Sequence, residues 1–168
     1  MRHAKSSWDH PGLPDVERPL ARRGQKAAGR MARRLARTVP LPELLLCSSA
    51  TRAAQTCQPI AALLGPSTEV RVEDGLYGAS GAELLARLRA LPDEVTSVLL
   101  IGHNPGVQDL LVELAGDGDP ARLDEVRAKF PTCALATLRV TARWSELGPS
   151  TTRFVDLVTP GTLGDPSQ

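Results

Sequence analysis

Two of the three histidines in this chain of 168 residues stand where an imidazole can do chemistry. His103 directly follows an apolar run at 98–101 that is typical of a buried strand, and it directly precedes a predicted helix. Arg52 stands in the same kind of place, just after another apolar run. In an open α/β sheet this is the carboxyl edge, where ligands bind and helix N-termini face anions. Arg2 and His3 would join this edge if they also followed a strand.

Two imidazoles and at least two guanidinium groups at one edge make a cationic pocket with no obvious carboxylate or thiolate ligand for a metal. Guanidinium forks match phosphate oxygens bidentately, so the expected ligand is a phosphoryl group. A neutral histidine can attack phosphorus and carry the phosphoryl group, while arginines hold the oxygens on which transition-state charge is spread. This chemistry needs no metal and no cofactor, and we expect neither.

The position of Arg52 favours a functional role. A cation in the first turn of a helix works against the helix dipole, by up to about 1 kcal/mol, unless an anion sits there. His10, in a loop flanked by Pro11 and Gly12, is interpreted as an ordinary structural or surface histidine instead.

The elements that must position these residues alternate between helices and strands. Helices are predicted at 24–38, 51–64 (after a cap at Ser48-Ser49), from Ser80 (a capping box with Glu83) and from Asn104 (cap) and Pro105 through Leu114, with a short one beyond Asp117. Strands are predicted at 43–47, around 70–72, at 98–101, 133–140 and 154–158, the last two as antiparallel neighbours. The pattern predicts an α/β fold, a three-layer α/β/α sandwich with a mostly parallel central sheet.

Composition and length indicate one globular domain. Hydrophobic residues make up 42% of the chain and charged residues 23%, near the globular average. We expect a single domain over 1–159 and a flexible tail over 160–168. There is no apolar run of about 20 residues and no signal peptide, so we expect a cytoplasmic protein with no membrane contact. The three cysteines, Cys47, Cys57 and Cys133, are interpreted as buried free thiols.

Basic residues are concentrated between Arg18 and Arg37, where eight Lys and Arg and no acidic residue occur although the net charge is only +1. They are interpreted mainly as an exposed helix face. The alternatives are docking of an acidic protein partner or of nucleic acid. The five aromatic residues and the lack of a reader motif argue against nucleic acid.

Several motifs together resemble the histidine phosphatase superfamily, and most of all its SixA-like phosphohistidine phosphatase branch. They follow one another in order from residue 2 to about residue 140: Arg2-His3-Ala4-Lys5-Ser6-Ser7-Trp8, Asp15-Val16-Glu17-Arg18-Pro19-Leu20 with Gly24, Ser48-Ser49-Ala50-Thr51-Arg52, Leu76-Tyr77, Ile101-Gly102-His103-Asn104-Pro105 and Lys129-Phe130-Pro131-Thr132. The resemblance implies a phosphoglycerate-mutase-like fold. It also implies that His3 accepts the phosphoryl group, that Arg2 and Arg52 bind its oxygens, that His103 completes the pocket, and that Arg18 adds a phosphate contact.

The substrate class depends on the proton donor. Larger branches of the superfamily carry a carboxylate that protonates an alkoxide leaving group, and the candidates here are Glu73 and Asp74. A phosphohistidine has a P–N bond whose nitrogen departs with less help. The resemblance therefore favours a metal-independent phosphatase acting on protein phosphohistidine. The alternatives are a phosphatase of small phosphate monoesters and a non-catalytic, phosphate-dependent binding module.

The resemblance also implies a short apolar strand ahead of Arg2, where the sequence has only Met1. Two explanations stay open. The recorded start lies a few residues downstream of the real one, which we favour, or the chain positions His3 without that strand, with a weakened centre to its sheet.

Overall fold

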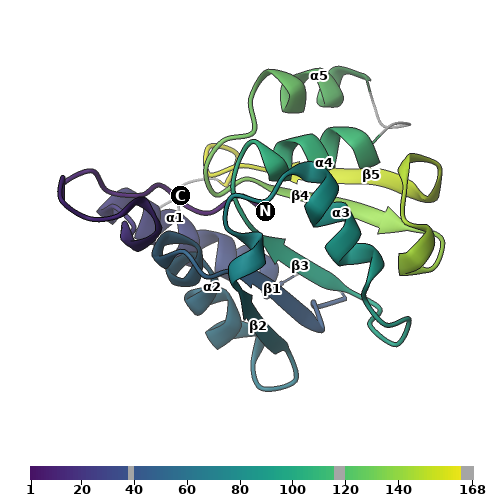
Figure 1. The fold of residues 1–168 in the computed structure, drawn as a ribbon, viewed down its shortest axis with the longest axis horizontal. Coiled ribbons are helices and arrows are strands. Elements are labelled where there is room, and N and C mark those ends of the chain that lie inside the picture. Colours follow the sequence, from purple (N-terminus) through teal and green to yellow (C-terminus); the bar gives the residue numbers. More distant parts are fainter. Residues whose placement is uncertain (38–39, 116–119, 164–168) are drawn as a thin grey trace.

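A computed structural model describes residues 1–37, 40–115 and 120–163. Its centre is a parallel sheet of three strands, β1 (Leu44–Ser48), β2 (Glu69–Glu73) and β3 (Val98–Ile101), in the order β2-β1-β3. All five residues of β1 are buried, as expected for a middle strand with both faces covered. Figure 1 shows the three strands side by side.

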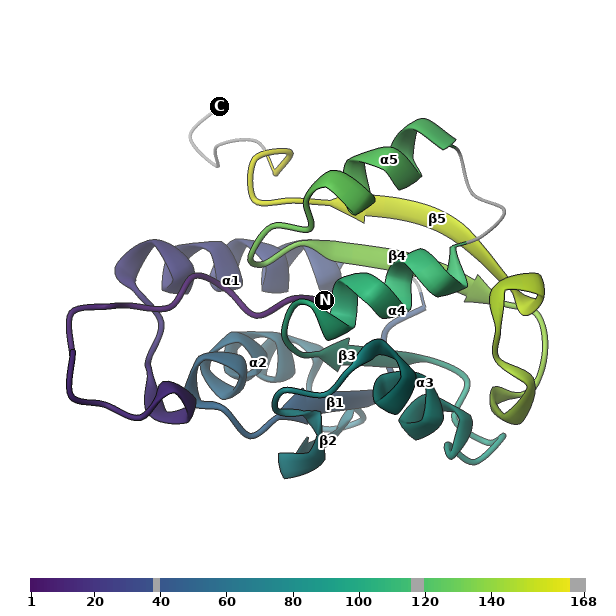
Figure 2. The ribbon, with the colours of Figure 1, turned by 45° about the horizontal axis from the view of Figure 1, so that its top comes forward.

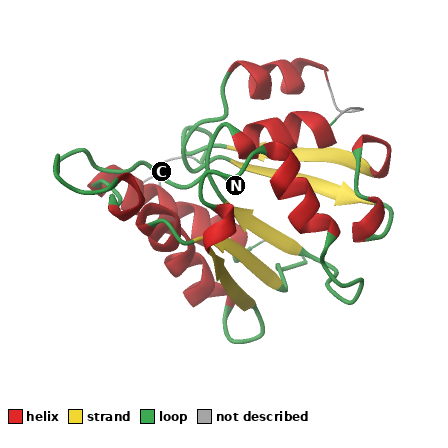
Figure 3. Cartoon of the chain, viewed as in Figure 1, coloured by secondary structure: helices red, strands yellow, loops and turns green. Residues whose placement is uncertain are grey.

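Helices cover both faces of this sheet, which confirms the predicted three layers (Figures 1 and 3). On one face, α1 (Arg22–Leu35) and α2 (Thr51–Leu64) pack against Leu45 and Cys47 of β1. On the other face, α3 (Gly81–Arg89) and α4 (Gly106–Leu114) pack against Leu44 and Leu46. The alternation along β1 follows from the strand period of two, which turns successive side chains to opposite faces. The helix α5 (Pro120–Ala128) contacts α4.

The remaining strands form an antiparallel pair, as predicted: β4 (Leu135–Val140) with β5 (Thr152–Val158). Four short 3₁₀ turns complete the described chain: η1 (Asp15–Glu17), η2 (Asp74–Leu76), η3 (Trp144–Glu146) and η4 (Pro149–Thr151). None of the helices within 1–37, 40–115 and 120–163 is long and apolar enough to cross a membrane.

The first three residues join the two sheets. Arg2 forms a parallel bridge with Gly102, just after β3, and its amide donates to the carbonyl of Ala134, just before β4. The Met1 carbonyl accepts from the Gly102 amide, and the Cys133 amide donates to Arg2. The backbone around Arg2 therefore lies between the two sheets and is hydrogen-bonded to the residues after β3 and before β4.

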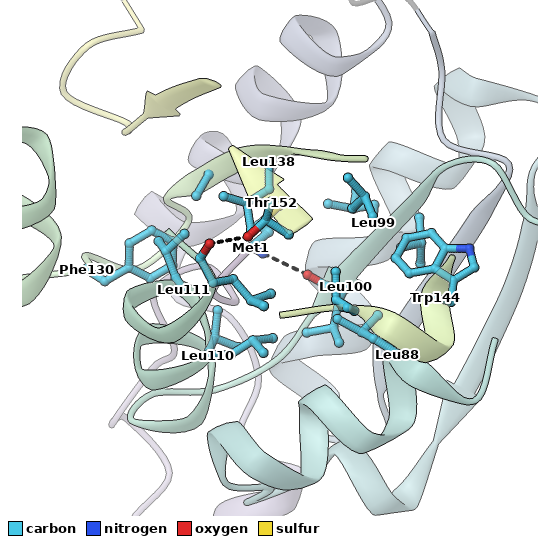
Figure 4. A pocket seen from close by; sticks show the side chains of 16 residues that line it. Met1, Leu88, Leu99, Leu100, Leu110, Leu111, Phe130, Leu138, Trp144 and Thr152 are labelled. Atoms are coloured by element: carbon cyan, nitrogen blue, oxygen red, sulfur yellow. Dashed lines mark hydrogen bonds between the residues drawn. The ribbon is translucent and has the colours of Figure 1, made fainter. Parts of the chain in front are cut away.

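Beyond Met1, an apolar cavity of about 140 Å³ lies between β3 and β4 (Figure 4). Leu99 and Leu100 line one side of it and Leu138 lines another. The Met1 amino group is buried and donates to the Leu100 carbonyl at 2.8 Å. Burial is the main cause that lowers the pKa of this amine from 8.0 to about 5. The cavity thus belongs to the core and is distinct from the cationic residues described below.

The predicted secondary structure was confirmed where the sequence pattern was strong. The helix at 51–64 and the strand at 98–101 have the predicted bounds, and the capping box of Ser80 and Glu83 is present. The helix predicted at 24–38 ends at Leu35, and Thr38 lies outside the described residues. The division into a domain at 1–159 and a tail stays a prediction, since 164–168 also lie outside them.

Two predicted helix caps were wrong. The N-cap of α4 is Pro105, while Nδ2 of the Asn104 side chain donates to Oε1 of Gln108 and to the Phe130 carbonyl. The N-cap of α2 is Ala50, which has no side-chain cap. The Ser48 hydroxyl accepts from the backbone amide of Ala50 at 3.3 Å, and its shorter contact, at 2.7 Å, is with His103, as described next. In both cases the polar side chain that the sequence predicts as a cap forms a hydrogen bond with a residue distant in the chain, Asn104 with Phe130 and Ser48 with His103.

Candidate active site

Backbone hydrogen bonds hold His3 in place at the carboxyl end of the sheet. The His3 amide donates to Gly102 at 3.0 Å, and its carbonyl accepts from the Cys133 amide at 3.0 Å. The next amide, that of Ala4, donates to the Thr56 hydroxyl at 2.9 Å, and that hydroxyl donates to the Arg52 carbonyl at 2.6 Å. The loop carrying His3 is therefore tied to β3, to the residues before β4 and to α2.

The hydrogen bonds of His3 define its tautomer. Its Nδ1 lies 2.7 Å from the carbonyl oxygen of Ala4, which can only accept, so Nδ1 carries the proton. In the neutral ring, Nε2 then keeps its lone pair. It accepts a hydrogen bond from Nε of Arg52 at 3.3 Å. The unprotonated nitrogen thus points into the cationic pocket, as a nucleophile must.

His103 adopts the opposite tautomer. Its Nδ1 lies 3.4 Å from Nη2 of Arg52, which can only donate, so Nδ1 is the acceptor. Its Nε2 therefore carries the proton and donates to the Ser48 hydroxyl at 2.7 Å. The rings of His3 and His103 lie 4.9 Å apart, centre to centre. Arg52 contacts both rings and so lies at the centre of the site.

Both imidazoles are neutral at neutral pH. Burial, joined by the positive charges of Arg52 and Arg2, lowers the pKa of His3 from 6.5 to about 3, although the bond to Ala4 opposes this. Burial, again the largest cause, and Arg52 lower the pKa of His103 to about 4, partly opposed by Asp15. A buried, neutral histidine beside fixed cations is ready to attack an electrophilic phosphorus.

Asp15 is a site residue that the sequence reasoning missed. Its Oδ2 lies 2.8 Å from Nη2 of Arg52 and 2.9 Å from the Tyr77 hydroxyl, and its Oδ1 lies 2.7 Å from Nη1 of Arg18. Partial burial raises its pKa, but the bonds from Tyr77, Arg52 and Arg18 together lower the pKa to about 2. The carboxylate is therefore ionised. The sequence feature that could have identified Asp15 is its spacing from Arg18, three residues further on in the same motif, which allows the two side chains to pair.

Arg18 joins the site through Asp15 and the loop after His3. Its Nη2 donates to the Ser6 hydroxyl at 2.6 Å and its Nε to the Ser7 carbonyl at 3.2 Å. The indole of Trp8 stacks on its guanidinium group at 3.4 Å, a cation–π contact. These contacts fix the guanidinium group at the rim of the pocket.

Arg2 is placed beside His3 by the chain itself. Its Nη1 donates to the Phe130 carbonyl at 2.8 Å, while its buried Nε has no hydrogen-bond partner within the described parts of the chain. A buried donor left without an acceptor costs about 1–3 kcal/mol. An oxyanion bound beside His3 would supply that acceptor.

The two predicted proton donors do not contact the histidines. Both carboxylate oxygens of Glu73 accept from the guanidinium group of Arg87, at 2.7 Å each, and that bond is the main cause that lowers the pKa of Glu73. The Asp74 side chain is exposed in the turn η2, which leads to Tyr77. Their role as proton donors stays a prediction.

The structure brings His3, Arg52 and His103 into direct contact. Arg18 is joined to Arg52 through Asp15, and Arg2 precedes His3 in the chain. His10 is exposed in its loop. The cysteines Cys47, Cys57 and Cys133 are free and buried, as predicted. No group of three or more His, Cys, Asp or Glu side chains within 1–37, 40–115 and 120–163 is placed to hold a metal ion.

Comparison with known proteins identifies the family. The model of the histidine phosphatase superfamily (branch 1) matches residues 1–84. An uncharacterized protein of Mycobacterium tuberculosis strain H37Rv is 36% identical over 162 residues, covering 95% of this chain and 99% of that protein. The chain belongs to the histidine phosphatase superfamily and is by family a phosphatase.

Solved structures agree with this assignment and with the fold. A candidate phosphohistidine phosphatase SixA of Nakamurella multipartitia is 32% identical with a TM-score of 0.81, over 95% of this chain and 93% of that one. The protein histidine phosphatase SixA, solved in complex with tungstate, is 28% identical with a TM-score of 0.77, over 98% and 97%. The three-layer architecture is therefore the phosphoglycerate-mutase-like fold.

Proposed function

We propose that the chain hydrolyses phosphohistidine on a protein, by two in-line transfers through His3. In the first step, Nε2 of His3 bonds to phosphorus as the P–N bond of the substrate breaks, and the substrate imidazole takes up a proton from solvent. In the second, water bonds to phosphorus and gives up a proton to solvent, the bond to His3 breaks, and inorganic phosphate leaves. The single observation that carries this proposal is the unprotonated Nε2 of His3, directed at Arg52 beside a second imidazole.

The cationic side chains have roles that follow from their positions. Arg52 contacts both imidazoles and would bind the equatorial oxygens of the phosphoryl group, where negative charge is spread in the transition state. The unpartnered Nε of Arg2 would donate to another oxygen. His103 would complete the pocket with its Nδ1, which a bound dianion would help to protonate. Arg18 would contact the phosphoryl group from the rim.

The choice of phosphohistidine rests on the state of the carboxylates. Asp15 contacts the central arginine, but its pKa is about 2, so it holds no proton to give at neutral pH. Glu73 is paired with Arg87. An alkoxide leaving group depends on a proton donor, whereas the imidazole of phosphohistidine departs with less help. The SixA likeness, to a protein named for phosphohistidine phosphatase activity, supports the same choice.

The intermediate is tested by rapid quench with a labelled phosphohistidine peptide. The wild-type protein is expected to carry acid-labile, base-stable phosphate, and His3→Ala is expected to carry none. His10→Ala is the matched control, because His10 is an exposed loop histidine and should leave the trapped phosphate unchanged. Equal labelling of His3→Ala would contradict the proposal. Binding of phosphate with neither labelling nor turnover would leave the phosphate-dependent binding module.

The substrate class is tested by turnover on a phosphohistidine peptide beside a panel of small phosphate monoesters. We expect the larger kcat/KM on phosphohistidine, inhibition by vanadate, and no effect of EDTA. A preference for a monoester would favour the small-molecule alternative, and an absolute metal requirement would exclude the mechanism.

A further inference from the structure

A cationic groove lies beside the candidate active site, along α1. It has a volume of about 670 Å³ and is bounded by α1, by the loop before β4 and by residues 159–161. Its charged lining consists of six basic side chains: Arg2, Lys5, Arg23, Lys26, Arg30 and Lys129. Among the described residues that line it there is no Asp or Glu.

The groove begins at the residues that flank His3. Arg2 and Lys5 line it and stand one position before and two positions after the proposed nucleophile. The Lys5 carbonyl accepts from the Ala21 amide at 2.9 Å, which fixes the start of α1 against the His3 loop. Figure 2 shows α1 running alongside the first residues of the chain. A molecule whose phosphoryl group is bound at His3 would thus lie next to the groove.

Three basic residues of the groove, Lys5, Arg23 and Lys26, are not explained by ion pairs that stabilise the described parts of the chain. The first turn of α1 holds Arg22 and Arg23 and no acidic residue, although a helix dipole disfavours cations there. Lys5, Arg23 and Lys26 form no ion pair with a carboxylate in the parts of the chain that the structure describes. Like charges gathered in a concave site raise the local concentration of anions.

The extent of the basic surface indicates a macromolecular partner. α1 has 14 residues, which corresponds to a length of about 21 Å at 1.5 Å per residue. Beyond the groove, Arg33 and Arg37 continue the exposed basic surface. A single phosphate or a small bisphosphate would contact only the part nearest to His3. An acidic protein face would contact the whole surface.

We propose that this groove, together with the exposed basic residues of α1, docks an acidic face of the substrate protein next to its phosphohistidine. This inference rests on the proposed function and adds to it the chemistry by which the substrate is chosen. Complementary charge of this kind mainly speeds encounter and sets specificity, and salt weakens it.

The probes are two phosphohistidine peptides of one length, phosphorylated chemically with phosphoramidate. One carries four glutamates around the phosphohistidine, and the other carries four glutamines. The test variant is Arg23→Glu/Lys26→Glu, at two exposed positions one turn apart on α1. The matched control is Arg139→Glu/Arg153→Glu, an exposed pair opposite each other on β4 and β5, which changes the net charge equally.

At low salt, the wild-type protein is expected to turn over the glutamate peptide with a kcat/KM about tenfold above that of the glutamine peptide, through a lower KM. The ratio should approach one at high salt and in Arg23→Glu/Lys26→Glu, and it should be kept in Arg139→Glu/Arg153→Glu. No preference in the wild-type protein, or an equal loss in both variants, would overturn the groove proposal.

Failure of the groove proposal and failure of the proposed function give different results. Anisotropy with a labelled, unphosphorylated glutamate peptide measures docking without turnover. Docking that the α1 variant loses, with hydrolysis of neither peptide, would retain the groove and reject the phosphohistidine phosphatase. Hydrolysis of both peptides without preference would retain the phosphatase and reject the groove.

Discussion

The carboxylate of Asp15 is bound to the guanidinium group of Arg52, with Oδ2 2.8 Å from Nη2. Arg52 is the same side chain that contacts both imidazoles of the site. An ionised carboxylate therefore lies against the arginine that we expect to bind phosphoryl oxygens. Substrate binding must place two negative groups near one guanidinium group, or move the carboxylate aside.

Asp15→Asn should therefore bind vanadate or inorganic phosphate more tightly than the wild-type protein. Removing one unit of like charge at about 4 Å is worth about 1 kcal/mol in water, or roughly fivefold in the inhibition constant. The measurement is inhibition of turnover by vanadate. Asp9→Asn is the control. It removes the same charge, but from a carboxylate that accepts from the Ser7 hydroxyl in the loop after His3. Weaker inhibition of Asp15→Asn would mean that the carboxylate mainly positions Arg52.

Arg52→Lys should lose most of the catalytic activity while the charge is kept. The planar fork reaches His3, His103 and Asp15 at once, and an ammonium group cannot reproduce that geometry. We expect kcat/KM to fall by about 10²–10³, the size found when a transition-state donor is removed. Arg71→Lys, at an arginine bound to Glu69 on β2, should leave kcat/KM unchanged. A loss below threefold in Arg52→Lys would contradict a central role for the fork.

Acid should destabilise the protein through its buried histidines. In the unfolded chain His103 titrates at its ordinary pKa of 6.5, whereas burial lowers the pKa in the folded state to about 4. Between these values the unfolded state binds a proton that the folded state rejects. Stability is thus complete above pH 6.5 and is lost as pH falls toward 4. At pH 5 the loss is about 2 kcal/mol for this residue.

The measurement is urea unfolding at pH 7 and pH 5. The free energy of unfolding of the wild-type protein should fall between these pH values. For His103→Asn the fall should be smaller by about 2 kcal/mol. His10→Asn, at the exposed histidine, should show the full wild-type fall. An identical fall in His103→Asn would show that His103 already takes up its proton in the folded state.

The elements that sequence predicts well here are those whose signal is local. The residues Val98–Ile101 form an apolar run that has to be a buried strand, and Ser80 with Glu83 forms a capping box whatever surrounds it. His103 and Arg52 could be assigned to one edge because carboxyl ends of parallel strands meet there, whereas the place of His3 followed from the family resemblance. Their contacts agree with that reasoning.

The features that sequence missed depend on partners distant in the chain. Asn104 has the residue type of a helix cap, but Nδ2 of its side chain donates to the Phe130 carbonyl, 26 residues away in the sequence. Asp15 is 37 residues from Arg52, in a turn whose approach to α2 no local pattern shows. Tertiary hydrogen bonds of this kind outweigh capping preferences worth about 1 kcal/mol.

The close approach of α1 to the His3 loop gives a last prediction, since it depends on a glycine. A Cβ added at Gly24 would overlap the carbonyl oxygen of Lys5, two residues after His3. Gly24→Ala must therefore displace that loop, and we expect a loss of about 1–3 kcal/mol in the free energy of unfolding, with reduced turnover. Gly29→Ala, on the same helix, meets only Nη1 of Arg33 at 3.8 Å and should stabilise the protein by about 0.5–1 kcal/mol. Urea unfolding and turnover of both variants check this, and equal effects would contradict the packing of α1 against Lys5.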